Sequence, residues 1–201
     1  MSPRTQEQFE EMRETRREQI MKAALELFAR EGYANCSISR LANHTGISKG
    51  LMYNYFESKE ALLGNIIEEG MSDIMAFFNP DNDGILTTEE LAGFVRKVLW
   101  SIRENQNFWI LYINIIFQPR VKELLAGKPF SSVMDQYGPM MMNYFENQGF
   151  ENPALEMLTF SALIEGFGML VVYGESGYEL PDELVQSYEE RVIGMLTRKQ
   201  A

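Results

Sequence analysis

The chain has 201 residues, of which 45% are hydrophobic and 12% are aromatic, so it can bury a sizeable core and is not a disordered chain. Its single cysteine, Cys36, excludes an intrachain disulfide and a cysteine-based metal cage. Residues 1–62 hold nine basic and nine acidic side chains, so the entire formal charge of −11 lies in residues 63–201. If the chain binds a polyanion such as DNA, the neutral N-terminal part would approach it ahead of the acidic remainder.

We expect neither a signal peptide nor a transmembrane helix. The first residues, MSPRTQEQFEEM, contain no apolar run. The most apolar stretch, Met157 to Tyr173, carries Glu165 in its middle, and a carboxylate costs about 2.5–3.5 kcal/mol at the centre of a bilayer. We therefore interpret this stretch as a buried helix and expect a cytoplasmic protein with no membrane partner.

Helical periodicity dominates the N-terminal third of the chain. An apolar stripe at i, i+3, i+4, i+7 and i+8 indicates the first helix and is formed by Ile20, Ala23, Ala24, Leu27 and Phe28. Gly32 is the expected C-terminal stop of this helix. A longer helix is expected to begin at Ser58 and to continue through Ile67.

Between these helices, residues 37–59 (SISRLANHTGISKGLMYNYFESK) predict a helix-turn-helix. Two short helices, 38–44 and 49–55, each follow a serine that can cap the helix N-terminus, and Gly46 lies in the turn between them. The second helix of such a unit must enter a major groove about 12 Å wide. We expect Leu51 and Met52 to anchor this second helix on the first.

The residues that then face outward suit DNA. Serine hydroxyls and unpaired N–H groups at helix N-termini can hold phosphates, a glycine lets the duplex approach closely, and tyrosine and lysine can donate to phosphates. The expected phosphate contacts are Ser37, Ser48, Gly50, Tyr53 and Lys59. Lys49 and Asn54 are the candidates for base contact, because an ammonium can pair with guanine and an amide with adenine. The alternative interpretation is that the aromatic residues here belong to the core and the lysines to a solvated face; Phe56 is expected in the core, and Tyr55 could take either role.

From about Arg16 to Ile67, the sequence resembles the DNA-binding domain of the TetR family of regulators. The matching segments are IMKAALELFAREGYANCSISRLA and TGISKGLMYNYFESKEALL, and the most specific run is SKG-x-x-Y-x-YF-x-SKE. The resemblance covers about a quarter of the chain, and Cys36 stands where the family often has Thr. It implies an all-α fold with a helix-turn-helix domain at 1–62, linked by the helix from 58 to a ligand-binding and dimerisation domain at 63–201. It also implies the phosphate contacts above, and base or groove contacts from Lys49, Asn54 and Tyr55.

The remainder of the chain also predicts helices. Residues 79–84 form a turn-rich loop, and Thr87 with Glu90 makes a capping box for the next helix. Residues 108–117 could be a strand by composition, but the all-helical context favours a helix. Proline and glycine then leave helices near 130–148, 153–174 and 181–198.

TetR-like regulators pair through their last two long helices, so the resemblance implies a homodimer. On the final helix, one face carries Leu184, Tyr188, Val192 and Met195, and on the helix before it Ala162 and Gly166 would allow close packing. Dimerisation would place two DNA-binding heads roughly 34–36 Å apart, the spacing that reads a palindromic site.

Aromatic and methionine side chains gather in the middle of the body, which is typical of a pocket for a bulky apolar molecule, although each alone is more often ordinary core. The candidate ligand-binding residues are Trp109, Tyr112, Met134, Tyr137, Met141, Phe160, Glu165 and Phe167. Glu165 could pair with a cationic group of a ligand or with the partner at the dimer interface. The expected function is a repressor that leaves its palindromic operator when a mainly apolar small molecule binds, with no cofactor.

Two other functions stay open: a TetR-like DNA-binding protein without an effector, and an enzyme that uses carboxylates only. The sole histidine, His44, lies in the helix-turn-helix, so no Ser-His-Asp or Cys-His constellation can be assembled. Residues 79–90, NPDNDGILTTEE, come close to the calcium loop of an EF-hand, but Asn79 replaces the first Asp and no second loop exists. The Thr87/Glu90 capping box already explains this segment, so we expect no metal site.

Overall fold

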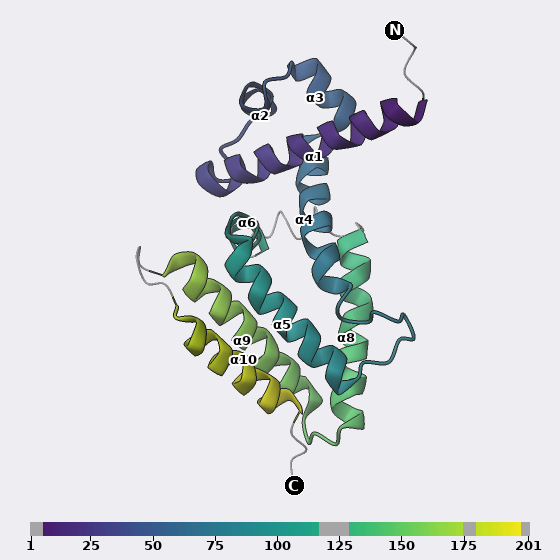
Figure 1. Ribbon diagram of the computed structural model, residues 1–201, viewed down its shortest axis with the longest axis vertical. Helices are drawn as coiled ribbons and strands as arrows, with labels where there is room; N and C mark the ends of the chain where they lie inside the picture. The colour runs from purple at the N-terminus through teal and green to yellow at the C-terminus, as the bar shows by residue number, and fades with distance from the viewer. Residues whose placement is uncertain (1–5, 117–128, 175–179, 198–201) are drawn as a thin grey trace.

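The computed structural model describes residues 6–116, 129–174 and 180–197, without the side chains of 129–134 and 136. Every regular element within these ranges is an α-helix, which confirms the predicted all-α class (Figure 1). The helices are α1 (Gln6–Glu31), α2 (Ile38–Thr45), α3 (Lys49–Tyr55), α4 (Lys59–Met75), α5 (Thr88–Glu104), α6 (Gln106–Ile116), α8 (Pro129–Asn147), α9 (Pro153–Tyr173) and α10 (Asp182–Thr197).

Helices α1 to α3 form one end of the molecule, and α4 runs from them into the larger helical body (Figure 1). The predicted stripe of α1 is mostly buried: Ala24, Leu27 and Phe28 are at most 1% exposed. Leu41 of α2 and Met52 of α3 are fully buried in the same core. Helix α2 packs on α1, and α3 packs on α2, so each short helix contributes one apolar side chain to the core of the head.

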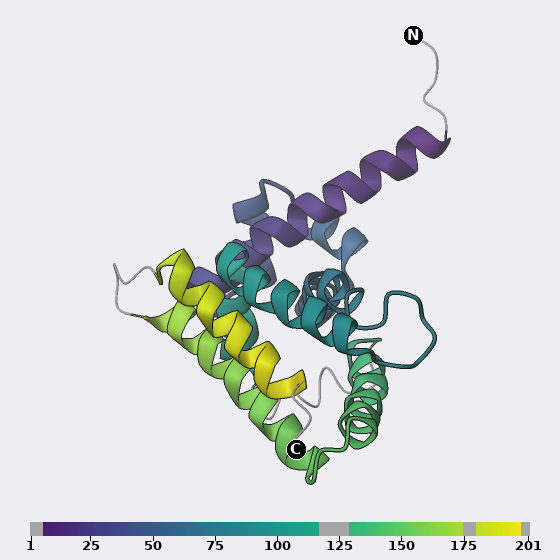
Figure 2. The ribbon, with the colours of Figure 1, turned by 60° about the horizontal axis from the view of Figure 1, so that its bottom comes forward.

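Helix α1 is longer than its apolar stripe indicated. It begins at Gln6, and all residues from 6 to 15 are exposed, including Phe9 and Met12. This N-terminal half projects from the rest of the molecule (Figure 2). The periodicity could not reveal it, because no side chain in this segment faces a core.

The body packs α5 beside α9 and α10, with α8 on the far side of α4 (Figures 1 and 2). The ring of Phe78, which follows α4, lies edge-on to Phe94 of α5 at 5.0 Å and to Tyr137 of α8 at 4.4 Å between centroids. This aromatic cluster joins three helices. Residues 108–116 of the stretch that was ambiguous in sequence belong to α6, so the helix interpretation is confirmed for them; Phe117 lies outside the described residues.

Helix α4 contacts α6 through a residue without a side chain. A Cβ placed on Gly70 would overlap the ring of Phe108, with ring atom Cζ only 2.7 Å away. Phe108 is 4% exposed, so its ring cannot move aside without disturbing its neighbours. Glycine at position 70 therefore allows the backbone of α4 to lie against α6.

We expect Gly70→Ala to destabilise the protein by up to about 2 kcal/mol, because overpacking costs about 1–3 kcal/mol and the better helix propensity of alanine returns about 1 kcal/mol. Gly93→Ala on α5 is the matched control: a Cβ there meets no atom within 4 Å, so this variant should be stabilised by about 0.5–1 kcal/mol. Urea unfolding measures both. Equal stabilisation by the two variants would contradict the packing at Gly70, and Gly70→Ala/Phe108→Leu should recover most of the loss.

Helix α9 is long and apolar enough to cross a membrane by length and composition, the one such helix in the part of the chain that the structure describes. Only 11% of its most apolar window is buried, with Phe167 and Gly168 as its fully buried residues. The expectation of a buried helix therefore holds for one face of α9 within the single chain. The opposite face is apolar and exposed.

Candidate nucleic-acid interface and ligand sites

Serine caps position both helices of the helix-turn-helix. The Ser37 hydroxyl accepts a hydrogen bond from the backbone N–H of Arg40 at 3.1 Å, and the Ser48 hydroxyl accepts one from Leu51 at 3.1 Å. Gly46 ends α2 in the left-handed conformation with φ of 68°, which glycine adopts without strain. Each cap uses an oxygen lone pair, so the hydroxyl hydrogen of each serine can still be donated to a phosphate.

The outer face of α3 carries the predicted contact residues. Ser48, Lys49, Gly50, Tyr53 and Asn54 are all exposed. A Cβ at Gly50 would meet no atom within 4 Å, so the fold itself does not require a glycine there. Tyr55 is partly buried against the core, and Phe56 is 3% exposed, as expected for a core residue. The expectation that Leu51 anchors α3 is wrong: Leu51 is 40% exposed, and Met52 is the buried residue of this helix.

Lys59, at the start of α4, is engaged within the chain. Its ammonium donates to the backbone carbonyl of Tyr33 at 2.9 Å and lies 4.2 Å from the centre of the Tyr33 ring. The Tyr33 hydroxyl in turn donates to Glu60 at 3.3 Å. Lys59 thus ties the turn after α1 to α4, a contact across 26 positions that no local pattern indicates. Its remaining N–H groups leave the predicted phosphate contact possible.

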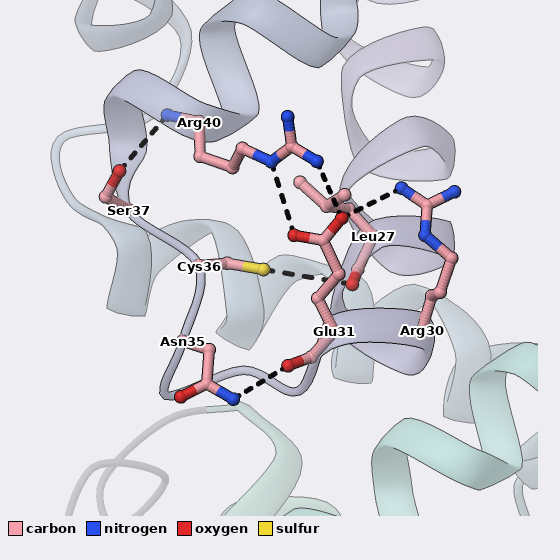
Figure 3. Close-up of polar contacts among 7 residues, drawn as sticks. All are labelled: Leu27, Arg30, Glu31, Asn35, Cys36, Ser37 and Arg40. Carbon is pink, nitrogen blue, oxygen red and sulfur yellow. Dashed lines mark hydrogen bonds and ion pairs between the residues drawn. The ribbon is translucent and has the colours of Figure 1, made fainter.

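A cluster of charged side chains surrounds Glu31 at the end of α1 (Figure 3). Arg40 of α2 donates to both carboxylate oxygens of Glu31, at 2.8 and 3.2 Å, and Arg30 donates at 3.0 Å. The hydrogen bonds from Arg40 and then Arg30 lower the pKa of Glu31 from 4.5 to about 2. The neighbouring Cys36 thiol is buried and points to the Leu27 carbonyl, and burial raises its pKa. The cluster joins α1 to the first turn of α2.

This cluster predicts a specific loss of stability in acid. Because folding lowers the pKa of Glu31, its ion pairs stabilise the fold above about pH 4.5, and this contribution is lost as the pH falls from 4.5 towards 2. The thermal unfolding midpoint, measured at about pH 6, about pH 4 and about pH 3, should fall more steeply with decreasing pH in wild type than in Glu31→Gln. Glu57→Gln, an exposed carboxylate on the same head, is the charge-matched control and should behave as wild type. Parallel curves for wild type and Glu31→Gln would contradict the prediction.

The predicted ligand-binding residues are packed against neighbouring side chains. Trp109 donates to Ser101 at 3.1 Å and lies edge-on to Tyr112, and Phe160 lies beside Phe94. Met141 and Phe167 are buried, and Tyr137 belongs to the aromatic cluster around Phe78. The side chain of Met134 lies outside the described residues.

Glu165 is exposed on α9, a position that is compatible with either predicted role, a contact with a ligand or with the partner at the dimer interface. The carboxylate of Glu165 also affects the Tyr112 hydroxyl. Burial of Tyr112 is the larger cause and the negative charge of Glu165 the smaller one, and together they raise the pKa of Tyr112 to about 12. Phe167 lines an open groove of about 490 Å³ between α9 and α10, together with Ala162, Gly166 and Tyr188. One predicted ligand residue, Phe167, and three of the predicted interface residues therefore meet in this groove.

The residues predicted for the dimer interface divide into two groups. Leu184 and Met195 are 49% and 43% exposed, Ala162 is exposed, and Gly166 has open space beside it. Tyr188 is partly buried, with its ring stacked on Phe167 and its hydroxyl donating to the Leu163 carbonyl at 2.7 Å. Val192 is only 1% exposed and packs inside its own chain, so it was wrongly assigned to the outer face.

The loop that resembles a calcium site is used internally. Glu90 accepts hydrogen bonds from the backbone N–H and the hydroxyl of Thr87, at 2.8 and 2.7 Å, which confirms the capping box. Asp81 and Asp83 accept from backbone N–H groups within the loop. Among the described residues, no group of three or more side chains could hold a metal ion.

Known proteins share both the head and the fold. The family of bacterial regulatory proteins described as the tetR family matches residues 20–66. An uncharacterised HTH-type transcriptional regulator of Bacillus subtilis, YerO, is 33% identical over 112 residues, which cover 54% of this chain and 39% of the relative. The fatty acid metabolism regulator protein of the same bacterium is 27% identical over 116 residues, covering 54% of this chain and 60% of that protein. The matches thus span less than two thirds of each of these relatives.

The structural likeness extends over the body. The fatty acid degradation regulator FadR from Bacillus halodurans superposes with a TM-score of 0.69 at 18% identity, covering 89% of this chain and 95% of that one. At this identity the likeness shows a shared fold. The matched head, the serine-capped α2 and α3 and the helical body together carry one conclusion: residues 20–66 form a helix-turn-helix domain of the tetR family of bacterial regulatory proteins, joined to a helical body that has the fold of solved regulators such as FadR.

Proposed function

We propose that this protein is a homodimeric transcriptional repressor that binds a palindromic DNA operator and leaves it when a mainly apolar small molecule binds. The head at residues 1–62 reads DNA, and residues 63–201 bind the effector and the partner chain. The observation that supports DNA binding most directly is the outer face of α3. It presents the exposed residues Lys49, Gly50, Tyr53 and Asn54, and the three side chains among them have no described partner, although the backbone carbonyl of Asn54 accepts a hydrogen bond from Arg13. Their chemistry suits phosphates and base edges.

The direct test selects binding sites from a random pool of DNA duplexes with the purified protein. A dimer with two heads should enrich a palindrome whose half-sites are about one helical turn, roughly 34–36 Å, apart. Further phosphate contacts come from Ser37, Ser48 and Lys59, and a groove contact comes from Tyr55. Footprinting of the DNA in the complex would map these contacts. A folded dimer that enriches no sequence at low salt would refute the function.

The partner in the dimer covers the exposed face of α9 and α10. Exposed apolar side chains gather there, and contiguous apolar patches on a surface mark interaction sites. They are Leu155, Leu158, Met169, Leu170, Tyr173, Leu184 and Met195. The open groove beside Ala162 and Gly166 can receive a side chain of the second copy.

We expect Leu184→Glu to convert the dimer into a monomer, because a charge would be buried without a partner at the interface. The matched control is Ile85→Glu, which places the same charge at a 61% exposed position in the loop before α5 and should leave the dimer intact. Sedimentation velocity measures both. Dimeric Leu184→Glu, or a monomeric wild type at micromolar concentration, would show that this face is not the interface.

An apolar effector is supported by the aromatic body and by the relative named for fatty acid metabolism. The candidates for its contacts are Trp109, Tyr112, Met134, Tyr137, Met141, Phe160 and Phe167, with Glu165 at the outer edge. Binding to the folded chain raises its stability by about 2.7 kcal/mol at a hundred times Kd, so a thermal-shift screen of apolar compounds tests this part. Regulation of transcription places the protein in the cytoplasm.

A further inference from the structure

A second cleft lies apart from the groove between α9 and α10. A space of about 730 Å³ opens where α1 and α4 meet α5 and α6, and we call it the junction cleft. Its lining residues come from α1 in the head, from α4, and from α5 and α6 in the body, including the turn between α5 and α6. The volume lies within the range of small-molecule sites.

Carboxylates dominate the charged side chains of the junction cleft. They are Glu18, Glu26, Glu69, Asp73 and Glu104. Among the described residues, none of these five forms an ion pair or a side-chain hydrogen bond. Of the three basic side chains in the cleft, two are engaged elsewhere: Arg103 donates to Asp182 at 2.6 Å, and Lys97 lies over the rings of Phe77 and Trp100. The third is the exposed Lys22. The cleft therefore holds an excess of unmatched negative charge.

The floor of the junction cleft is apolar and partly aromatic. Met21 of α1, Ile74 of α4 and Phe108 of α6 line it and are at most 6% exposed. Trp100 of α5 lines the rim and is 53% exposed, an unusual exposure for so large an apolar side chain. Exposed carboxylates above an apolar floor, with an indole ring at the edge, match a ligand that carries a positive charge on an apolar or aromatic group.

We propose that the junction cleft binds an organic cation that carries an apolar or aromatic group. The electrostatic state of Glu69 agrees with this assignment. Burial first raises its pKa, Arg17 lowers it, and the charges of Glu18, Glu14 and Asp73 raise it further. A cation between these carboxylates removes their mutual repulsion.

A ligand in the junction cleft touches both the head and the body. Gly70 and Phe108, which form the close contact between α4 and α6, both line it. A ligand that binds one placement of the head on the body more tightly than another shifts the protein towards that placement and, with it, changes operator affinity. This last consequence rests on the proposed function, whereas binding of the cation does not.

The test is calorimetric titration of the whole protein at low salt with benzyltrimethylammonium and, separately, with benzoate, an aromatic anion. We expect saturable binding of one cation per chain and no binding of benzoate. Glu69→Gln/Asp73→Asn should weaken cation binding by about tenfold or more. Asp81→Asn/Asp83→Asn changes the net charge equally but lies in the loop before α5, and should leave the affinity within about twofold.

Three results would overturn the proposal: no saturable binding of the cation to wild type, unchanged affinity in Glu69→Gln/Asp73→Asn, or equal losses in both double variants. Quenching of tryptophan fluorescence gives a second measurement, because Trp100 lines the cleft while Trp109 is 6% exposed. Trp100→Phe should abolish the fluorescence response and retain binding. If the protein binds the cation but enriches no DNA sequence, the cleft site stands and the DNA-binding function is refuted. If it enriches a palindrome but does not bind the cation, the DNA-binding function stands and the cleft site is refuted.

Discussion

Replacing Phe78 by alanine should lower the free energy of unfolding by about 3–5 kcal/mol, the cost of removing a buried aromatic side chain. Phe78 is 1% exposed and lies edge-on to both Phe94 and Tyr137, so its loss leaves a cavity where α4, α5 and α8 meet. For a chain of this length, the melting temperature should fall by roughly 6–20 °C. Urea unfolding and differential scanning calorimetry measure the two quantities.

The adjacent residue provides the control. Phe77 is 47% exposed, and its one described ring contact is with the Lys97 ammonium at 5.0 Å. Phe77→Ala should therefore cost no more than about 1 kcal/mol, the upper range of an exposed cation–π contact. Similar losses from both variants would mean that the Phe78 cluster is not the centre of the body core. Tyr137→Leu should lose less than Phe78→Ala, because it keeps the space filled.

The largest expected effect on affinity comes from the outer face of α3. Lys49→Ala/Tyr53→Ala should weaken binding to the selected operator by about a hundredfold, since a base contact contributes about 1–3 kcal/mol and a phosphate contact adds to it. Both side chains are exposed, so the stability of the variant should stay within about 0.5 kcal/mol of wild type. Fluorescence anisotropy with labelled operator, titrated at several salt concentrations, measures the effect.

Salt dependence separates the two roles. If Lys49 neutralises a phosphate instead of reading a base, Lys49→Ala reduces the slope of log K against log salt by about 1 and weakens all sequences alike. If it reads a base, discrimination at one operator position is lost. Tyr53→Phe removes only the hydroxyl of Tyr53, so its loss of operator affinity measures the contribution of that hydroxyl. Lys22→Ala removes an exposed lysine of α1 in the junction cleft, and an equal loss there would attribute the effect to overall charge.

Local signals in the sequence predicted most helix boundaries. Ser37, Ser48 and the Thr87/Glu90 capping box each begin the helix that they were expected to begin, because a cap depends on residues at most three positions apart. The body helices near 130–148, 153–174 and 181–198 agree with α8, α9 and α10 within one residue. The first fourteen residues of α1 were missed, because that segment has no apolar stripe.

Side-chain environments were predicted less well than helices. Leu51 and Val192 were placed wrongly because their environments were assigned from spacing alone. Spacing shows that a residue lies near the apolar side of a helix, but not whether the neighbouring helix covers that position. Lys59 contacts Tyr33, and Arg40 contacts Glu31, through turns whose geometry is set by tertiary packing. The junction cleft has residues from four helices, and no segment of the sequence alone indicates that they meet.

The unbroken course of α4 sets the scale of motion that regulation requires. Its 17 residues extend about 25 Å from the Ser58 cap in the head to the aromatic cluster in the body. A tilt of about 5° over that length displaces the head by roughly 2 Å. In the proposed dimer, two heads moving oppositely would change their separation by about 4 Å against a half-site spacing of about 34 Å. A sub-ångström adjustment beside Gly70, a little over one turn from the body end of α4, would thus become a shift of several ångströms between the two heads.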